Sequence, residues 1–591
     1  MRLSRKFLLS ARDWESYVPI VPILKNYQRG DLSHDLVAGL VVGIITIPQA
    51  VAYAYLAGVP PESGLYACLV PMLLYAVFGS SRQLVVGPVA VAALMVAATV
   101  SQHAPKYSDA YLGITTIICL QAGIFLWLLR LSRMGGLVNL LSHPVITGFV
   151  NAAAILIIVS QLPAFTGLEI NNSQQPWLVL TDTLASLGNT DLTTLLFGGA
   201  ALALLLSFKW IAVFGARLVG FTISENHAAT RVGPMVVAAL AAVAVVTLNL
   251  SDELDIVGAV PSGLPSLTVP PFDPVLWLEL LPASTMIALV SYIESYSIGT
   301  TLAAKRQTRV NAHQELIAIG AANIGASFTG AYPVAGSFSR SSVNYYSGGR
   351  TPISSVVCAV IIVFTLLFLT PFFEVLPTAV LAAIVMVSVV GLMDLKNGPR
   401  HWQLHREDTI TEYATLVMVL FLGVEFGLIG GVILSIAFFV RTSSRPNITQ
   451  VGRLADTEHF RSIKRYDVET LPNVLALRID ENIYFANATQ IEDKCLKRSQ
   501  RRRSTEHLLI VCSSVNMIDA TGVQMLHRLN ANLERAGITM NFCDLKGTLL
   551  PRLQEAGLLE SMTGENFISA DRAMRHFERE AAASSDAEEQ K

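Results

Sequence analysis

The sequence predicts an α-helical polytopic membrane protein with about fourteen transmembrane segments, followed by a C-terminal α/β domain. Of its 591 residues 52% are hydrophobic and only 15% are charged, with a mean hydropathy of +0.51. Soluble chains carry about 25% charged residues. Charges are sparse from about Leu36 to Val440 and dense from Arg441 onward. This step in composition predicts a large membrane domain and then a soluble domain of roughly 150 residues.

The membrane domain is divided into apolar segments of the length that bilayers require. The segments are 36–57, 64–79, 88–101, 110–129, 137–161, 192–208, 232–249, 276–301, 313–329, 337–347, 352–371, 376–393, 409–424 and 426–440. A spanning helix needs about 20 apolar residues, so 88–101 and 337–347 are too short to cross alone. Together they predict fourteen spans.

Basic residues indicate the orientation of these spans. They gather in every second loop, and the intervening loops carry few. The residues in the basic loops include Arg82, Arg130, Lys209, Arg217, Lys305, Arg306, Arg309, Arg350, Arg406 and Arg441. The positive-inside tendency then places both termini in the cytoplasm, which requires an even number of spans. No signal peptide is recognisable, and we expect a multi-pass protein of a bacterial inner (plasma) membrane.

These patterns define the expected domain boundaries. Residues 1–30 form a cytoplasmic N-terminal segment and 31–441 the membrane domain, while 449–578 form the α/β domain and 579–591 a disordered tail. The tail domain alternates the strands "NVLALRID", "HLLIVCSS" and "ITMNFCDL" with helices, the pattern of a small α/β sheet.

Composition and motifs also argue against several functions. The net charge of −2 provides no basic field for nucleic acid. The six cysteines are scattered singly, so neither a metal cluster nor a disulfide framework is expected. The sequence has no Gly-rich phosphate-binding loop, so nothing in it suggests ATP-driven pumping. We therefore expect no enzyme activity, no metal and no cofactor.

The two short segments share one design. "LVVGPVAVAALMV" (84–96) and "YPVAGSFSRSSVN" (332–344) each have an extended lead-in and then a short helix. If the second half begins with the eighth span, at about Leu276, each short segment is the third of its half. This matching position predicts two inverted repeats of seven spans. A matched pair of interrupted segments points to a transporter's binding site. A single Pro/Gly break could equally be a simple kink.

Each short helix would begin near the midplane with free N–H groups and a partial positive charge. Two such starts facing one cavity make an anion site, here near Val89 and Ala90 and near Ser337, Phe338 and Ser339. Arg340 would add a full positive charge to this site. A cation at that depth usually pairs with an anion or lines a functional cavity. The alternative is an arginine whose side chain snorkels to the membrane interface.

Glu294 is the candidate for ion coupling. It is the one carboxylate flanked by long apolar sequence on both sides, in "ALVSYIESYSIGTT". A desolvated glutamate can hold a proton at neutral pH. We expect Glu294 to carry H⁺ or to bind Na⁺; a structural, hydrogen-bonded or ion-paired glutamate is the alternative. Glu294 is also a candidate counterpart of Arg340.

Several stretches resemble one known family. "IPQAVAYAYLAGVPPESGLY" (47–66), "GPVAVAAL", "SYIESYSIGTTLAAK" and "NAHQELIAIGAANIGASFTGAYPVAGSFSRSSVN" are similar to motifs of the SulP sulfate permease family, also called solute carrier family 26. The tail, with "IDATGV" (518–523), resembles a STAS domain. The resemblance covers about residues 20–575.

The resemblance implies a UraA-like fold, in which a core domain (spans 1–4 and 8–11) moves against a gate domain (spans 5–7 and 12–14). It also implies homodimers and an elevator-type cycle. By position it implies substrate-binding roles for Gln49, Tyr53, Val89, Ala90, Ser339 and Arg340, and proton coupling for Glu294. One departure is Ala50, where the family usually has Gly.

In STAS domains the position of Thr521 can be phosphorylated, and a phosphate is tolerated at a helix N-terminus. The alternative is that Asp519 or Thr521 simply caps the helix, with the domain acting as a scaffold or as a docking site for a cytoplasmic protein.

We therefore expect a secondary anion transporter in the lipid bilayer, most simply one for sulfate coupled to H⁺. Na⁺-coupled bicarbonate or H⁺-coupled dicarboxylate uptake is the first alternative. A nucleobase symporter and a passive anion channel or sensor are further ones. Arg340 argues against the nucleobase symporter, because a neutral base needs no buried cation, and Glu294 argues against the channel.

Overall fold

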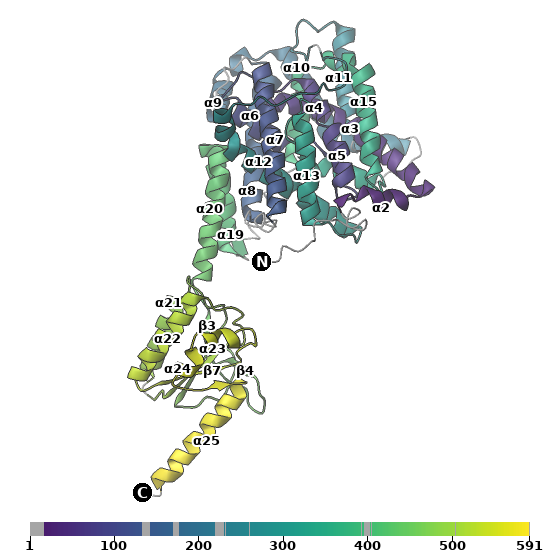
Figure 1. Cartoon of the computed structure of the whole chain (residues 1–591). Helices are drawn as coiled ribbons and strands as arrows, with labels where there is room; N and C mark the ends of the chain where they lie inside the picture. Colours follow the sequence, from purple (N-terminus) through teal and green to yellow (C-terminus); the bar gives the residue numbers. More distant parts are fainter. Residues whose placement is uncertain are drawn as a thin grey trace. The chain divides into compact units, whose positions relative to one another are not determined.

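The computed structural model describes residues 17–132, 142–168, 176–218, 230, 232–258, 260–391, 393–394, 402–403, 405–502 and 504–589 (Figure 1). Residues 1–16 of the predicted N-terminal segment, the first residues of the predicted span 137–161, and residues 590–591 lie outside this part. The chain divides into two compact units, Met1–Ser435 and Ile436–Lys591, and the boundary falls inside the helix Val424–Ser443, which is described with the first unit.

The first unit is helical apart from two short strands. Its elements, in chain order, are α2 (Ile20–Lys25), α3 (Arg29–Ala57), α4 (Pro61–Tyr66), α5 (Val70–Phe78), β1 (Val86–Gly87), α6 (Ala90–Val100), α7 (Asp109–Leu131), α8 (His143–Thr166), α9 (Pro176–Ala185), the 3₁₀ turn η2 (Leu187–Asn189), α10 (Leu192–Leu218), α11 (Gly233–Leu248), α12 (Pro274–Lys305), α13 (Ala312–Ser327), β2 (Ala335–Gly336), α14 (Phe338–Tyr346), α15 (Ile353–Phe368), α16 (Thr370–Glu374), α17 (Thr378–Val390), α19 (Arg406–Leu422) and α20 (Val424–Ser443).

Every predicted span contains a helix of this unit. In the described part of the chain, seven helices are long and apolar enough to cross a bilayer, and shorter apolar helices include α6, α11, α15 and α17. The helical polytopic fold is thus confirmed, whereas the count of fourteen spans stays a prediction. The predicted span 64–79 is split, because the chain turns between α4 and α5 and a proline opens each of the two helices.

Local signals explain where several helices begin. Asp273 caps α12 by accepting from the N–H groups of Val275 and Leu276, and Asn311 caps α13 in the same way. Side-chain caps of this kind satisfy N–H groups that have no partner within the helix. α12 and α13 thus begin at residues that the sequence marks clearly.

The helices pack in two sets. One set joins α3, α5, α7, α13 and α15 with α6, α12 and α14, and Gly123 and Gly320 allow α7 and α13 to cross closely. The other set joins α8 with α17 and α19, and α10 with α11 and α17. The two sets meet where α3 contacts α17 and α11.

The second unit is an α/β domain. Its strands are β3 (Ile448–Arg453), β4 (Phe460–Ser462), β5 (Val474–Ile479), β6 (His507–Val511), β7 (Thr539–Cys543) and β8 (Asn566–Phe567), in the sheet order β4-β3-β5-β6-β7-β8. β5 to β8 are parallel, and β3 is antiparallel to both of its neighbours. The helices are α21 (Ala488–Arg501), α22 (Ala520–Arg535), α23 (Leu550–Glu555), α24 (Leu558–Ser561) and α25 (Ala570–Glu589).

The three strands predicted in the tail are confirmed as β5, β6 and β7, and the helix expected to follow Asp519 is α22. The end of the chain differs from the sequence-based expectation of a disordered segment from residue 579, because α25 continues to Glu589. Alanine and glutamate make up seven of the eleven residues from Arg579 to Glu589, and both are strong helix formers.

Candidate functional site between two broken helices

The two interrupted segments meet in the middle of the first unit. β1 and β2 pair antiparallel, with Val86 opposite Gly336 and Gly87 opposite Ala335. Beyond the pair, the N–H of Ser337 donates to the carbonyl of Val85 at 3.1 Å, and the N–H of Val85 donates to the hydroxyl of Ser341 at 2.9 Å. The extended lead-ins therefore satisfy each other's backbone groups, as non-helical backbone in a membrane requires.

Neighbouring helices hold the second lead-in from both sides. Asn323 of α13 uses both ends of its amide, accepting from the N–H of Val334 at 3.0 Å and donating to its carbonyl at 3.1 Å. The hydroxyl of Ser295 in α12 accepts from the N–H of Gly336 at 2.7 Å. A Cβ on Gly336 would lie 2.7 Å from a methyl carbon of the buried Leu84, so any larger residue here would require the Leu84 side chain to shift.

Each lead-in runs directly into a short helix. α6 follows Val89, which provides no side-chain cap, and α14 follows Ser337, whose hydroxyl accepts from the N–H of Arg340 at 3.5 Å. Val89, Ala90 and Ser337 are buried, whereas Phe338 is 46% exposed and Ser339 is exposed. At the start of α14, Ser337 and Arg340 are thus buried, whereas Phe338 and Ser339 are open to solvent, and the substrate-binding roles of all four stay predictions.

Arg340 is the connection between the two half-helix starts. Its side chain is fully buried, and Nη2 donates to the carbonyl of Pro88 at 2.7 Å. A Cβ on Gly87 would lie 3.2 Å from the same nitrogen, which explains the glycine. Nε and Nη1 are buried without a hydrogen-bond partner. A cation with two unused donors is thereby fixed at the place where α6 and α14 begin.

Gln49 and Tyr53 lie in the same region of α3. Both side chains are buried, and the Oε1 atom of Gln49 has no hydrogen-bond partner. Tyr53 interacts with the hydroxyl of Ser388 in α17 and is close enough to Arg340 to respond to its charge. Tyr53 therefore lies where the two sets of helices meet.

Glu294 is half-buried on α12, a helix that packs against β2, α6 and α14. Arg340 and Glu294 interact electrostatically, but no ion pair within 4 Å joins them in the described structure. No hydrogen bond engages the Glu294 carboxylate among the described residues either. The suggested pairing of Glu294 with Arg340 is thus a long-range interaction and not a direct contact.

Sequence reasoning missed two fully buried carboxylates, Asp35 and Glu315. Asp35 accepts from the N–H groups of Arg350 at 2.7 Å and Thr351 at 3.0 Å, and from the hydroxyls of Thr351 and Tyr27. Both carboxylates lie close to the ends of predicted spans, so nothing in the sequence distinguishes them from residues solvated at the interface.

Glu315 makes a similar set of contacts, with α5 and with the loop before β1. It accepts from the hydroxyl of Tyr75 at 2.8 Å, and from the N–H and hydroxyl of Ser80 at 2.9 and 2.7 Å. The signal that could have identified both carboxylates is the hydroxyl-rich loop that each one contacts, but the pairing is visible only in three dimensions.

In the second unit, Asp519 caps α22. Its carboxylate accepts from the N–H of Gly522 at 2.7 Å and from the N–H of Phe485 at 2.9 Å. Thr521 is exposed on the first turn of this helix. Across the described residues, no group of three or more His, Cys, Asp or Glu side chains is arranged to hold a metal ion.

Comparison with known proteins identifies the family. A model described as "Sulfate permease family" matches residues 32–415, and one described as "STAS domain" matches residues 465–572. Among named relatives, a probable sulfate transporter 4.2 from Arabidopsis thaliana is 35% identical over 546 residues, covering 90% of this chain and 79% of its own. The chloroplastic sulfate transporter 4.1 of that plant is 33% identical, with 94% and 82% covered.

Solved structures agree on the fold. The murine Solute Carrier 26 family member A9 anion transporter, solved in an inward-facing state, is similar with a TM-score of 0.88 at 23% identity, over 97% of this chain and 96% of that one. The transmembrane domain of a cyanobacterial bicarbonate transporter, BicA, gives a TM-score of 0.58 at 21% identity, over 69% of this chain and 98% of that one. The chain therefore belongs to the sulfate permease family and is a multi-pass membrane transporter with a C-terminal STAS domain.

Proposed function

We propose that this protein is a secondary active transporter that takes up sulfate together with H⁺. The anion is held between the half-helices α6 and α14, in a fold of fourteen spans arranged as two inverted repeats of seven. Relatives named sulfate transporters, 35% and 33% identical over most of the chain, support sulfate as the substrate.

One observation carries the proposal: the antiparallel pairing of Val86–Gly87 with Ala335–Gly336. This pairing brings the N-termini of two helices to one point. Free N–H groups and the aligned peptide dipoles make such ends favourable for an anion. The unused Nε and Nη1 donors of Arg340 add a charge that no acid within 4 Å neutralises in the described structure.

The packing of the helices supports an elevator-type cycle. The set built on α3, α7, α12 and α13 carries both half-helices, and corresponds to the expected core of spans 1–4 and 8–11. The set built on α8, α17 and α19 corresponds to the gate. We propose that the core moves against the gate, that the protein is a homodimer, and that it resides in a plasma membrane with both termini cytoplasmic.

Radiolabelled sulfate uptake into proteoliposomes tests the anion site. Arg340→Ala should lower uptake about tenfold or more, because the site loses a charged, bidentate donor. Arg441→Gln, which removes an exposed arginine at the end of α20, is the matched control and should keep the wild-type rate. Wild-type uptake by Arg340→Ala would rule out Arg340 as a binding group.

Coupling is tested on Glu294, whose carboxylate has no direct partner in the described structure. Wild-type uptake should accelerate when the outside is made acidic, and Glu294→Gln should transport at a rate that no longer responds to the pH gradient. If a Na⁺ gradient drives uptake and a pH gradient does not, the coupling ion is Na⁺. A Glu294→Gln variant that still follows the pH gradient would exclude this residue as the coupling group.

The nature of the anion is tested by competition. Unlabelled sulfate should suppress uptake of labelled sulfate more strongly than bicarbonate or a dicarboxylate such as succinate. A stronger effect of either competitor would favour the alternative of Na⁺-coupled bicarbonate or H⁺-coupled dicarboxylate uptake. Uptake that never exceeds the equilibrium distribution under any gradient would favour a passive channel.

For the STAS domain we propose a scaffold role and a cytoplasmic partner, with Thr521 as a candidate phosphorylation site. Its exposed hydroxyl on the first turn of α22 supports this, because a helix N-terminus tolerates a phosphate. Mass spectrometry of the protein from native cells tests it, and consistent absence of phosphate on Thr521 would refute the modification.

A further inference from the structure

Two of the connections between the core set and the gate set of helices are joined to each other. Residues 249–273 lead from α11 of the gate set to α12 of the core set, and residues 369–377 lead from α15 of the core set to α17 of the gate set. Part of each connection is extended, and Ile256 lies opposite Pro377 in an antiparallel bridge. We call the paired segments Asp255–Gly258 and Glu374–Thr378 the linker ladder.

Backbone hydrogen bonds fix the linker ladder to the gate set. The N–H of Val257 donates to the carbonyl of Leu376 at 2.9 Å, and the N–H of Gly258 donates to that of Glu374 at 3.1 Å. The N–H of Thr378 donates to the carbonyl of Asp255 at 2.8 Å. Thr378 is the first residue of α17, where N–H groups have no partner within the helix. The ladder therefore caps a gate helix and is expected to move with it.

Beyond the ladder, the connection to α12 is bonded to the core set instead. The N–H of Gly263 donates to the carbonyl of Leu366 in α15 at 3.1 Å, and the N–H of Thr268 donates to that of Phe328 at the end of α13 at 2.9 Å. Gly258 and Gly263 both have a positive φ, with nothing within 4 Å of an added Cβ. Glycine adopts such a backbone without strain. One connection is thus bonded to the gate at Gly258 and to the core at Gly263.

One core side chain also bonds directly to the linker ladder. Tyr55, in the last turn of α3, donates its hydroxyl to the carbonyl of Val257 at 2.9 Å, while the N–H of Val257 is bonded within the ladder. The ring of Tyr55 lies 5.8 Å from that of Tyr107, whose N–H donates to the carbonyl of Gly58 at 2.9 Å. Tyr55 is therefore held by the core set, and its hydroxyl contacts a segment held by the gate set.

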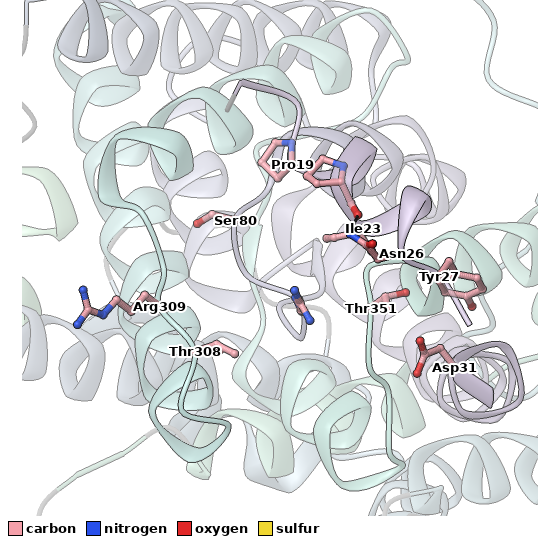
Figure 2. A pocket seen from close by; sticks show the side chains of 11 residues that line it. Pro19, Ile23, Asn26, Tyr27, Asp31, Ser80, Thr308, Arg309 and Thr351 are labelled. Carbon is pink, nitrogen blue, oxygen red and sulfur yellow. Dashed lines mark hydrogen bonds between the residues drawn. The ribbon is translucent and has the colours of Figure 1, made fainter. Parts of the chain in front are cut away.

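The other end of α3 makes bonds of a different kind. There Tyr27 and Thr351 donate their hydroxyls to Asp35. These bonds lie beside a cavity of about 510 Å³, and Figure 2 shows Tyr27, Asp31 and Thr351 together on one side of it. Thr351 directly precedes α15, so this network joins two core helices and can persist when the core moves as one body. The bond from Tyr55 joins the core to the gate-bound ladder and cannot persist in the same way.

We propose that the Tyr55 hydroxyl is a catch for the transport cycle. It holds the core to the linker ladder in the conformation described here, and the bond breaks when the core moves against the gate. The ladder itself stays paired and moves with α17. This inference rests on the proposed elevator cycle and names a bond that is made in one of its conformations and absent from the other.

The experiment measures the distance between the two sets by double electron–electron resonance, on the full chain in detergent with and without sulfate. Spin labels are attached to Gln102→Cys after α6 and to Leu248→Cys at the end of α11, two exposed positions, whereas the six native cysteines are buried. Tyr55→Phe keeps the ring and removes the bond. The population at the separation seen in this structure should fall about two- to tenfold relative to the other population.

Tyr111→Phe is the matched control. It removes a hydroxyl bond of the same kind, to the carbonyl of Ala57 at 2.6 Å, but this bond joins α7 to α3 within the core set and its loss should leave the ratio unchanged. Two distances with a wild-type ratio in Tyr55→Phe, or an equal shift in Tyr111→Phe, would overturn the catch and leave the elevator cycle standing. A single distance under all conditions would overturn the elevator cycle and the catch with it.

A disulfide tests whether the ladder stays paired. Ile256→Cys/Pro377→Cys places two thiols at positions that lie opposite each other in an antiparallel bridge, where the Cα separation suits a disulfide. The oxidised variant should take up sulfate into proteoliposomes at the rate of its reduced form. If oxidation stops uptake and a reductant restores it, the ladder has to open during the cycle, which contradicts its assignment to the gate. Failure of the disulfide to form also counts against a persistent ladder.

Discussion

Removing the Glu315 carboxylate is predicted to destabilise the membrane unit strongly. Glu315 lies in the first turn of α13 with no exposure to solvent, and its two oxygens accept from Tyr75 and twice from Ser80. Glu315→Ala leaves these three donors without their acceptor and leaves a cavity behind. The loop between α5 and β1 loses its attachment to α13 at the same time.

The size of the effect follows from the number and burial of the donors. A buried donor left without a partner costs about 1–3 kcal/mol, so three would cost up to about 9 kcal/mol. Water can reach part of Ser80, which is only half-buried, so a loss of about 4 kcal/mol in the free energy of unfolding is expected. With an unfolding entropy of about 2.1 cal/mol/K per residue over roughly 400 residues, this lowers the midpoint by about 5 °C.

The assay is thermal unfolding of the purified full chain in detergent, followed by size-exclusion chromatography of the fraction that stays monodisperse. Glu279→Ala is the matched control, because the Glu279 side chain is 62% exposed and lies 3.4 Å from the Nε2 atom of His103 at the surface. Glu315→Gln should lie between wild type and Glu315→Ala, since one acceptor oxygen remains. A Glu315→Ala midpoint within about 1 °C of wild type would refute the reasoning.

Three further predictions address the lead-ins and the cysteines. Gly336→Ala should cost about 1–3 kcal/mol, because its Cβ would lie 2.7 Å from buried Leu84, whereas Gly199→Ala, with nothing within 4 Å, should be neutral or slightly stabilising in the same thermal assay. Asn323→Leu removes both hydrogen bonds to Val334 and should cost about 2–4 kcal/mol and lower sulfate uptake; unchanged stability and uptake would contradict its holding role. All six cysteines are buried, and burial raises the pKa of Cys495 to about 12, so maleimide should label none of them in the folded protein and all six in detergent-denatured protein.

The sequence predicts the broken helices well because their causes are local. Pro88, Gly336 and Ser337 interrupt apolar segments in a way that no continuous span explains. The structure places β1 and β2 together at the positions where these residues predict lead-ins. The burial of Arg340 also agrees with the expectation of a charge well inside the membrane domain.

The contacts of Asp35 and Glu315 could not be predicted in the same way. Each carboxylate binds a loop that lies more than two hundred residues away in the sequence, Thr351 for Asp35 and Ser80 for Glu315. Periodicity and composition describe neighbours along the chain, whereas these contacts arise from the crossing of the two halves. Glu412 illustrates the same limit, since its position near a span end predicts interfacial solvation, yet it is 3% exposed.

The buried charges of the membrane unit fall into two kinds, and the difference argues for where a ligand belongs. Asp35 and Glu315 are surrounded by donors that engage both of their oxygens, so their charges are compensated by the fold itself. Arg340 is equally buried, but it donates to one carbonyl and keeps Nε and Nη1 without partners. Native proteins satisfy nearly all buried polar groups, and an uncompensated buried cation costs several kcal/mol. An anion between α6 and α14 would accept from both free donors and also neutralise the charge, whereas a neutral ligand could at most satisfy the donors, so the same geometry favours an anion over a neutral substrate.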